Sequence, residues 1–356
     1  MGSERTRNWM KIAVIGAGVC GLSAARALCS RGHSVVLHEQ FELFHDRGSS
    51  HGASRIVRRA YPDAFYTACM AEAYPMWHDL EAASGKRLLH ECGLLFFGPS
   101  DSPNLKSMAA GLSSLDVPFS SLDATQTVDL LPELRLGKDE IAIWTPEAGW
   151  VDAALALRTI FELACADGLI TKTGAQANPL ELAADNDVVI VAAGAWTPRF
   201  ASISVRVTLQ TYAYVEAQVA GPVWIEDSVE FAYGFPSTSL GLKLGIHGAG
   251  ESIDPAFPGR EPSKEVQDFI RQTADRRFGI ADPVLREPKG CLYTTTKTED
   301  FLLGRLAPNV FFASACSGHG FKMGPWIGKL LADFAEGKDT PERHKRFFWS
   351  ADAPSA

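Results

Sequence analysis

The chain contains 356 residues, 46% of them hydrophobic, and carries a formal net charge of −8 at pH 7. This length and apolar content are enough for two domains that each bury a core. The acidic balance, with basic residues grouped only in short pairs, argues against nucleic acid or an anionic membrane as the main partner. We therefore expect the partner to be a small molecule.

The cysteines and the apolar runs bear on the cellular compartment. Seven cysteines are an odd number and none form a C-x-x-C pair, so we expect no disulfide framework and no metal site. No apolar run reaches about 18 residues, and no signal-like leader precedes the first apolar stretch. We expect a cytoplasmic monomer that does not interact with a membrane.

Residues 11–39 have the pattern of a strand–helix–strand (βαβ) unit. Two apolar runs, at 12–15 and 35–37, enclose the pattern of an amphipathic helix. The turn after the first run carries a G-x-G-x-x-G motif, and an acidic residue ends the second run. The residues are Gly16, Gly18, Gly21 and Glu39.

Each of these residues has a physical role in a dinucleotide site. Gly16 permits the tight turn, Gly18 lets a pyrophosphate approach the backbone, and Gly21 lets the helix pack closely on the strand. The phosphates would lie at the helix N-terminus. Glu39 follows Gly16 by 23 residues, where a carboxylate accepts hydrogen bonds from a ribose diol. The unit predicts an adenine dinucleotide, FAD or NAD, over a simple packing turn.

A polar, glycine-bearing stretch follows at residues 45–61 and contains four arginines within thirteen residues. A solvated loop is one interpretation, because charged runs usually face water. The other is that an anionic ligand near the dinucleotide requires the charge. The arginines are Arg47, Arg55, Arg58 and Arg59.

The rest of the chain alternates between helical and strand patterns. Residues 185–196 read as a buried strand that ends in small residues, including Gly194, where a backbone can approach a cofactor. An apolar strand at 310–313 leads into a loop with Gly318 and Gly320. Helices are expected at 62–85, 105–112, 152–168, 263–278 and 325–336, and antiparallel strands between 208 and 250 and between 291 and 306.

Four stretches, read together, resemble the sarcosine oxidase branch of the D-amino-acid-oxidase-like flavoproteins, which includes N-methyltryptophan and pipecolate oxidases. The stretches are GAGVCG at 16–21, SSHGASRIVRRAY at 49–61, YGFP and KLGIH at 233–247, and CLYTTT at 291–296 followed by SGHGFK at 317–322.

The resemblance implies a discontinuous fold of mixed α/β and α+β class. A Rossmann-type FAD-binding domain would comprise residues 1–88, 147–203 and 298–356. A mainly antiparallel-sheet substrate domain, lying over the flavin, would comprise residues 89–146 and 204–297.

The resemblance also implies a covalent thioether between FAD and the cysteine of the C-x-Y-T motif, here Cys291. A single cysteine is more often a small buried hydrophobe, but Cys291 is expected to open a strand beside polar threonines. Cys316 is a second thiol, immediately before SGHGFK. We assign the attachment to Cys291 because the Tyr293-Thr294 part of the motif is intact.

For the substrate, the resemblance assigns Arg58 and Lys322 to a carboxylate, which a guanidinium fork and a point charge hold together. Taken alone, Lys322 would more often be a solvent-facing loop residue. Tyr293 would line the same pocket as a substrate-binding residue.

The resemblance further assigns roles around the flavin. Arg55 would lie against the flavin and stabilise its reduced anionic form, and Lys243 would stabilise the charge that develops on oxygen. His247 and Tyr233 would lie near the bound substrate, and His319 would contact the flavin or brace the loop. Further expected cofactor contacts are Ser54, Gly194, Gly318, Gly320 and Lys322.

These assignments predict an FAD-dependent oxidase of secondary amines that bear a carboxylate, such as N-methyl or cyclic amino acids. The neutral amine loses hydride to the flavin, the imine product hydrolyses, and oxygen is reduced to hydrogen peroxide, with no external base. The alternatives are a dehydrogenase that uses an electron carrier, a non-catalytic flavoprotein subunit, and an NAD enzyme. The substrate's side chain is not readable from these motifs.

Overall fold

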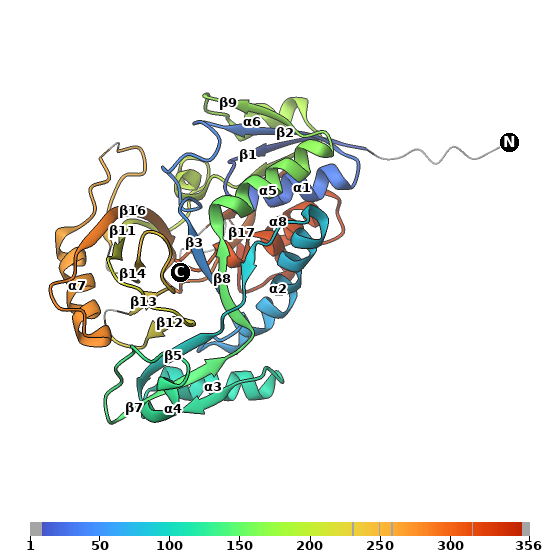
Figure 1. Cartoon of the computed structure of the whole chain (residues 1–356). Coiled ribbons are helices and arrows are strands. Elements are labelled where there is room, and N and C mark those ends of the chain that lie inside the picture. Colours follow the sequence, from blue (N-terminus) through green and yellow to red (C-terminus); the bar gives the residue numbers. More distant parts are fainter. Residues whose placement is uncertain (1–8, 230, 249, 258, 315, 351–356) are drawn as a thin grey trace.

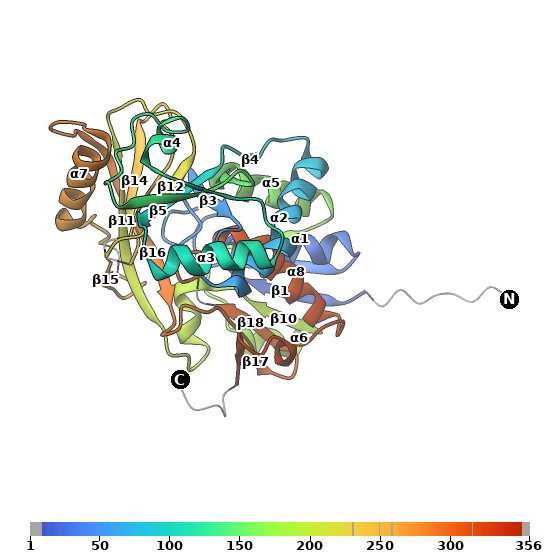
Figure 2. The same ribbon diagram turned by 90° about the horizontal axis from the view of Figure 1, so that it is seen from below.

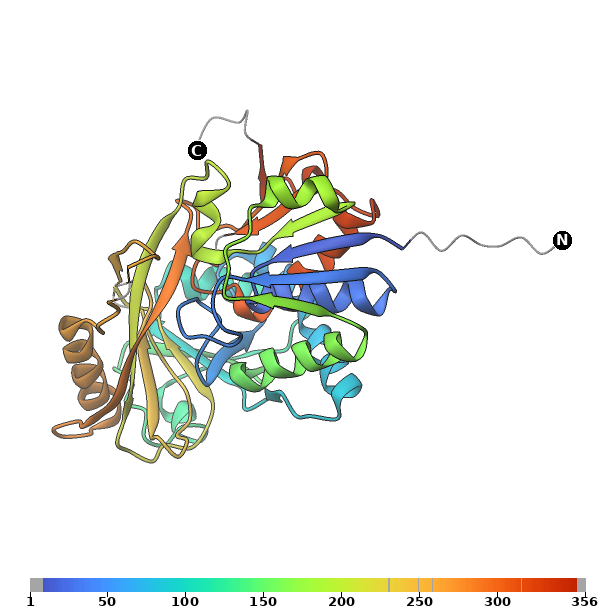
Figure 3. The same ribbon diagram turned by 90° about the horizontal axis from the view of Figure 1, so that it is seen from above.

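The computed structural model describes residues 9–229, 231–248, 250–257, 259–314 and 316–350. Within these ranges the strands form three sheets. Two large sheets lie on opposite sides of the molecule, and each is flanked by its own helices (Figure 1 and Figure 3). Residues 1–8, 230, 249, 258, 315 and 351–356, which the predicted domain ranges include, lie outside the described residues.

The first sheet is built around the βαβ unit. In the described chain it has seven strands in the order β19-β17-β18-β10-β1-β2-β9, and each neighbouring pair is parallel except β17 with β18, which is antiparallel. The apolar run at 12–15 is buried on both faces, as expected for a central parallel strand. The strands are β1 (Lys11–Ile15), β2 (Ser34–Glu39), β9 (Ile170–Thr173), β10 (Val188–Val191), β17 (Leu302–Ala307), β18 (Val310–Ser314) and β19 (Phe348–Trp349).

Helices cover this sheet and form the largest apolar cluster of the protein with it. Helix α2 continues through Pro75. Asp63 caps its N-terminus, where the side chain accepts a hydrogen bond from the N–H of Phe65, and Gly85, at φ +67°, caps its C-terminus. The helices are α1 (Val19–Ser30), α2 (Ala64–Ser84), α5 (Ala153–Ala166), α6 (Pro179–Asp185) and α8 (Gly324–Ala335), with short 3₁₀ turns η1 (Gly194–Arg199), η2 (Phe321–Met323) and η3 (Pro341–Arg343).

The second sheet is mainly antiparallel, with β5 and β12 as its parallel pair. Helix α7 (Lys264–Phe278) covers its outer face (Figure 2). In this helix Arg277 pairs with Glu226 and Glu140, both on strands. The strands are β5 (Leu94–Pro99), β6 (Ser120–Leu122), β7 (Glu140–Thr145), β11 (Arg206–Val215), β12 (Val223–Glu226), β13 (Ala232–Gly234), β14 (Leu242–Ile246), β15 (Glu251–Ser252) and β16 (Leu285–Thr295).

A small third sheet connects the two. It consists of β3 (Ser54–Arg58), β8 (Ala148–Asp152) and β4 (Leu89–His90), in the order β3-β8-β4 within the described residues. Helices α3 (Pro103–Ser114) and α4 (Ala124–Val128) complete the elements. Strand β3 contains Arg55 and Arg58 of the arginine-rich motif and lies between the two large sheets (Figure 1).

Two expected strand boundaries were wrong. Cys291 does not open a strand, because β16 begins at Leu285, where the polar residues that precede the cysteine already pair with β11. The buried strand expected at 185–196 ends at Val191, and the small residues after it form a 3₁₀ turn with Gly194 at φ +54°.

The predicted combination of a Rossmann-type sheet and a mainly antiparallel sheet is confirmed. The strands of the two large sheets fall within the two sets of residue ranges predicted for the two domains, while the domain boundaries themselves stay a prediction. No helix in the described part of the chain is both long and apolar enough to cross a membrane.

Candidate functional site

A cavity of about 1260 Å³ lies between the two large sheets. It is lined by the segments that leave the carboxyl ends of β1, β10 and β18, by β3, and by residues of β13, β14 and β16. Ligands commonly bind at this edge of an open α/β sheet. The predicted site residues that line the cavity are Gly16, Gly18, Glu39, Ser54, Arg55, Arg58, Gly194, Tyr233, Lys243, His247, Cys291, Tyr293, Gly318, His319, Gly320 and Lys322.

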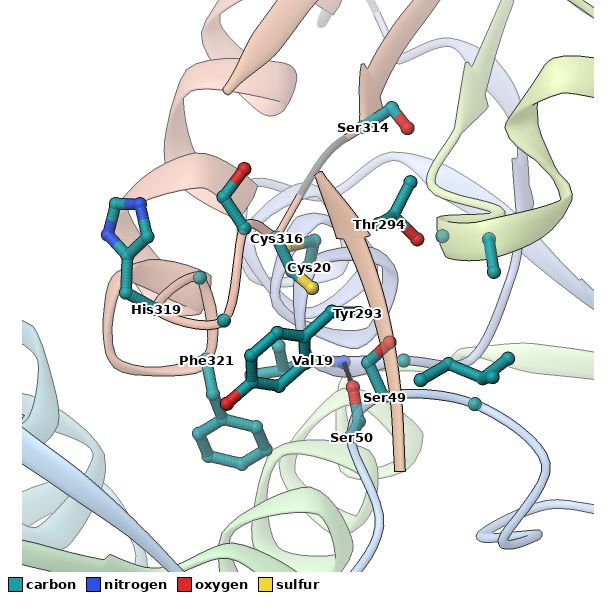
Figure 4. A pocket seen from close by; sticks show the side chains of 18 of the residues that line it. Val19, Cys20, Ser49, Ser50, Tyr293, Thr294, Ser314, Cys316, His319 and Phe321 are labelled. Atoms are coloured by element: carbon teal, nitrogen blue, oxygen red, sulfur yellow. Dashed lines mark hydrogen bonds between the residues drawn. The ribbon is translucent and has the colours of Figure 1, made fainter. Parts of the chain in front are cut away.

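The glycine motif forms one end of this cavity. Gly16 has φ +102°, a backbone conformation that residues with a side chain rarely adopt. A Cβ at Gly21 would lie 1.9 Å from the carbonyl oxygen of Gly16, so no other residue fits there. Gly21 is thus a packing residue that does not line the cavity. At the N-terminus of α1, the N–H of Val19 donates to Oγ of Ser50 at 3.1 Å (Figure 4).

Glu39 lies beside this turn with only 6% of its surface exposed. Its carboxylate accepts from the N–H of Ala17 at 2.9 Å and of Phe41 at 3.0 Å, and His45 Nε2 lies 3.4 Å away. Burial alone would raise the pKa of Glu39, but these hydrogen bonds lower it. The carboxylate is therefore ionised and acts only as an acceptor.

Arg55 and Cys291 meet on another wall of the cavity although they are far apart in sequence. The guanidinium of Arg55 donates to the carbonyls of Ser54 and Ser49, each at 2.9 Å, and to that of His51. Its Nη2 lies 3.7 Å from Sγ of Cys291, which is also 3.7 Å from the Ser49 oxygen. Burial raises the pKa of the Cys291 thiol, and Arg55 opposes that shift.

Lys243 is a deeply buried cation, with 3% of its surface exposed. Its Nζ donates to the Ser54 carbonyl at 3.0 Å and lies 3.1 Å from the Ser54 hydroxyl. It also lies 4.5 Å and 4.6 Å from the ring centres of Tyr212 and Phe235. Burial and the nearby Arg55 hold the pKa of Lys243 well below its usual value.

Arg58 and Lys322 form a pair of buried cations, 9% and 6% exposed. The Arg58 guanidinium stacks over the Tyr61 ring at 4.1 Å, and its Nη1 has no hydrogen-bond partner. Lys322 Nζ donates to the carbonyl of His319 at 3.2 Å. Burial lowers the pKa of both groups, and Arg58 lowers that of Lys322 further. Neither cation forms an ion pair with any residue that the structure describes, so both are available to an anion.

Aromatic and imidazole rings form the adjoining wall. His247 lies 5.4 Å from the Tyr293 ring, and burial, Arg58 and Lys322 lower its pKa to about 4. Gly318, at φ +74°, makes room for both rings, because a Cβ there would approach them to 2.4–2.5 Å. Burial raises the pKa of Tyr233 to about 12.

His319 contacts residues around the cavity as well as lining it. Its Nδ1 lies 3.3 Å from the Tyr61 hydroxyl and its Nε2 lies 3.2 Å from the Glu299 carbonyl oxygen. In Figure 4 it comes, with Cys316 and Phe321, from the segment after β18, opposite the strand that carries Tyr293 and Thr294.

The four arginines of the motif at 45–61 do not all fit one of the two interpretations given above. Arg55 and Arg58 line the cavity, whereas Arg47 is exposed and Arg59 pairs with Glu147 at 3.2 Å outside it. The solvated-loop interpretation is therefore right for Arg47 and wrong for Arg55 and Arg58, while Arg59 is half-buried outside the cavity.

Several residues of the site were not singled out from the sequence, among them Ser50, Tyr61 and Phe231. Ser50 and Tyr61 lie inside the motif at 49–61, so the motif was the available signal for them. Phe231 lines the cavity and has φ +50°, a backbone conformation that the local sequence pattern does not predict.

Several buried polar atoms around the cavity lack a partner, which is unusual for a protein interior and indicates that a polar ligand belongs there. They are His51 Nε2, Arg58 Nη1, Trp196 Nε1, Gln210 Oε1, Thr294 Oγ1, Ser314 Oγ and Ser317 Oγ.

Comparison with known proteins agrees with this geometry. The family described as "DAO: FAD dependent oxidoreductase" matches residues 11–334. The chain is 31% identical to the peroxisomal sarcosine oxidase of Mus musculus, over 94% of this chain and 93% of that protein. It is 28% identical to N-methyl-L-tryptophan oxidase of Yersinia pestis (strain Pestoides F), over 92% of this chain and 95% of the relative.

Among solved structures, NikD, an unusual amino acid oxidase, has the same fold, with a TM-score of 0.82 and 23% identity over 98% of this chain and 99% of that chain. The family match extends from the first strand of the βαβ unit almost to the end of α8. The chain belongs to the DAO family of FAD-dependent oxidoreductases.

Proposed function

We propose that this protein oxidises amino acids whose nitrogen carries a second carbon substituent, such as N-methyl or cyclic amino acids, and that it uses oxygen as the acceptor. The observation that carries the proposal is the pair of buried cations, Arg58 and Lys322, which face the cavity without an ion-pair partner among the described residues. The activities named for the sarcosine and N-methyl-L-tryptophan oxidases support the same substrate class.

The cavity suits FAD, because its partnerless polar atoms and its glycine-lined end offer the contacts that a dinucleotide needs. The turn at Gly16 and Gly18, with the N-terminus of α1, would hold the pyrophosphate. Glu39 would accept from the ribose. Ser54, Gly194, Gly318, Gly320 and Lys322 would contact the rest of the cofactor. When bound, FAD supplies a two-electron acceptor that takes hydride from the substrate carbon and passes the electrons to oxygen, giving hydrogen peroxide.

We assign the substrate's carboxylate to Arg58 and Lys322. A guanidinium can hold both carboxylate oxygens in a fork, and the lysine adds a compact charge. Arg55 and Lys243 line the cavity too, and nearby positive charge lowers the pKa of a bound amine. The site therefore favours the neutral nitrogen that hydride loss requires, and no residue is needed as a base. The imine that results is hydrolysed by water.

Two further roles follow for the same wall. Arg55 and Lys243, both cationic and close to Cys291 and Ser54, are placed to stabilise negative charge that develops on the reduced ring and on oxygen. We also propose that Cys291 carries the FAD covalently. It lines the cavity, and Arg55, 3.7 Å from its sulfur, opposes the rise that burial causes in the pKa of the thiol.

The test is a hydrogen peroxide assay over a panel of N-methyl, cyclic and primary amino acids, together with their decarboxylated amines, on protein whose visible spectrum shows bound flavin. We expect peroxide from the secondary amino acids and little from the amines. Anaerobic reduction by a substrate without peroxide formation in air would instead identify a dehydrogenase.

A further inference from the structure

Arg58 and Lys322 pose a problem of their own, because two buried like charges side by side repel each other. No acidic side chain pairs with either cation in the described ranges. Both, however, contact one ring: the Arg58 guanidinium lies 4.1 Å and Lys322 Nζ 5.4 Å from the centre of Tyr61, which is 6% exposed. The face of an aromatic ring attracts cations, and most strongly where water is excluded.

We propose that Tyr61 is a positioning residue, whose ring holds the two cations at a fixed separation for an incoming carboxylate, and that His319 fixes the ring through the Tyr61 hydroxyl. The inference rests on the proposed function in one respect: it takes the anion to be the carboxylate of the substrate.

The direction of the hydrogen bonds can be worked out from the partners. His319 Nε2 lies 3.2 Å from the carbonyl oxygen of Glu299, which can only accept, so Nε2 carries the proton. Nδ1 of the neutral ring is then an acceptor, and the Tyr61 hydroxyl, 3.3 Å away, donates to it. A protonated His319 could not accept this bond. Burial, with Lys322 and Arg58 nearby, keeps the pKa of His319 well below its usual value, so the neutral form prevails.

His319 is itself held firmly. Its ring stacks on Phe301 at 4.7 Å and meets the edge of Tyr66 at 4.8 Å. Its backbone carbonyl accepts from Lys322 Nζ at 3.2 Å. Tyr61, His319 and Lys322 thus contact one another in a closed set, and Arg58 stacks on the Tyr61 ring. Both cations are anchored to one rigid unit, so binding a carboxylate requires little reorganisation.

The test uses the flavin-loaded protein and propionate, a simple carboxylate that the enzyme cannot oxidise. Propionate is titrated into the protein, and its binding is followed by the change in the visible spectrum of the flavin. Tyr61→Leu removes the ring face, and we expect about tenfold weaker propionate binding, the loss of a desolvated cation–π contact. Tyr61→Phe keeps the face and loses only the hydroxyl, so about threefold is expected. The matched control is Tyr74→Phe, which removes a hydroxyl that donates to Glu91 at 3.0 Å, away from the cavity, and should leave binding unchanged.

A double variant tests the link to His319. If the histidine acts through the Tyr61 hydroxyl, Tyr61→Phe combined with His319→Ala binds propionate no more weakly than His319→Ala alone. Multiplied losses would remove His319 from the proposal. KM for an N-methyl amino acid should rise in Tyr61→Leu by the factor seen for propionate, with kcat/KM for the decarboxylated amine changed less than about twofold.

The outcomes separate this inference from the proposed reaction. Weaker propionate binding in Tyr61→Leu supports the positioning role even if no amino acid in the panel is oxidised. The inference is overturned if wild-type protein binds no propionate, if Tyr61→Leu binds it as tightly as wild type, if Tyr74→Phe loses as much, or if Tyr61→Leu impairs acid and amine equally. Thermal unfolding of each variant identifies a general loss of fold.

Discussion

Replacing Arg58 with lysine is the most direct test of how the cavity binds its substrate. The two arginines at 58 and 59 are neighbours in sequence with opposite surroundings. Arg58 is 9% exposed, lines the cavity and has an unpartnered Nη1. Arg59 points away and pairs with Glu147. Arg58→Lys keeps the charge and removes the fork, and Arg59→Lys makes the identical change outside the site.

The expected loss follows from burial. Truncating one partner of a buried, hydrogen-bonded charge pair costs about 2 to 5 kcal/mol, which is about 30-fold to several thousand-fold in kcat/KM. Arg58→Lys retains a cation, so we expect about 30-fold, at the lower limit. Lys322→Met removes the second cation altogether, and its effect should lie higher in that range.

The assay compares kcat/KM for an N-methyl amino acid and for the same molecule without its carboxylate. The loss should appear with the acid and shrink to less than about threefold with the amine, because only the acid uses the fork. Arg59→Lys should leave both values unchanged. Equal losses on acid and amine, or no loss on the acid, would refute the assignment of a carboxylate to Arg58 and point to a simple amine as substrate.

Three further predictions concern other parts of the molecule. Cys291→Ser should release FAD into the supernatant on acid precipitation, whereas Cys316→Ser should retain it in the pellet; the reverse result would move the attachment to Cys316. Lys243→Met should leave anaerobic reduction by substrate within about tenfold of wild type but slow reoxidation by air by about two orders of magnitude, a loss of ~3 kcal/mol, and unchanged reoxidation in a stopped-flow trace would contradict this role. Arg277→Met should destabilise the fold by about 2 kcal/mol at pH 7 in urea titrations, because it removes the charged hydrogen bonds to Glu140 and leaves Glu226 with Arg276 alone. The carboxyl of Glu140, which pairs with Arg277, has a folded-state pKa below its usual 4.5, because the hydrogen bonds from Arg277 outweigh burial. Its contribution to stability is therefore present above pH 4.5 and is lost as pH falls through the folded value, so the gap in stability between variant and wild type should narrow in acid. A gap that persists there would contradict the ion-pair explanation.

The elements that follow local rules were predictable from the sequence. The βαβ unit, with its turn at Gly16 and packing contact at Gly21, depends on residues within a short stretch, and the helices at 62–85 and 263–278 are marked by caps such as Asp63 and Ser263. The sequence-distant partners of β16 were not predictable in this way. Its polar first half is a strand only because β11 pairs with it, so Cys291 was wrongly expected at a strand end.

The same distinction between local and long-range features applies to the site residues. Which residue types line the cavity could be predicted, because the motifs that carry them are short. How they contact one another could not: Arg55 and Cys291 are 236 positions apart, and their contact depends on the packing of β3 against the second sheet. The same holds for Tyr61 and His319, whose hydrogen bond joins the segment between β3 and α2 to the loop before η2.

Phe231 shows why the substrate's side chain is harder to predict than its carboxylate. A bulky residue at φ +50° costs about 1 to 3 kcal/mol and persists only where its surroundings enforce it. Here the Phe231 carbonyl accepts from the N–H of His247 at 3.1 Å, and its own N–H donates to the Ser228 carbonyl at 3.2 Å. The ring lies 5.8 Å from both His247 and Phe96, and Phe96 in turn lies under Arg58 at 5.7 Å. The wall next to the proposed carboxylate site is therefore shaped by a strained turn, by β5 and by the residue after β14, so its shape depends on contacts among three segments and not on the pattern of any one of them.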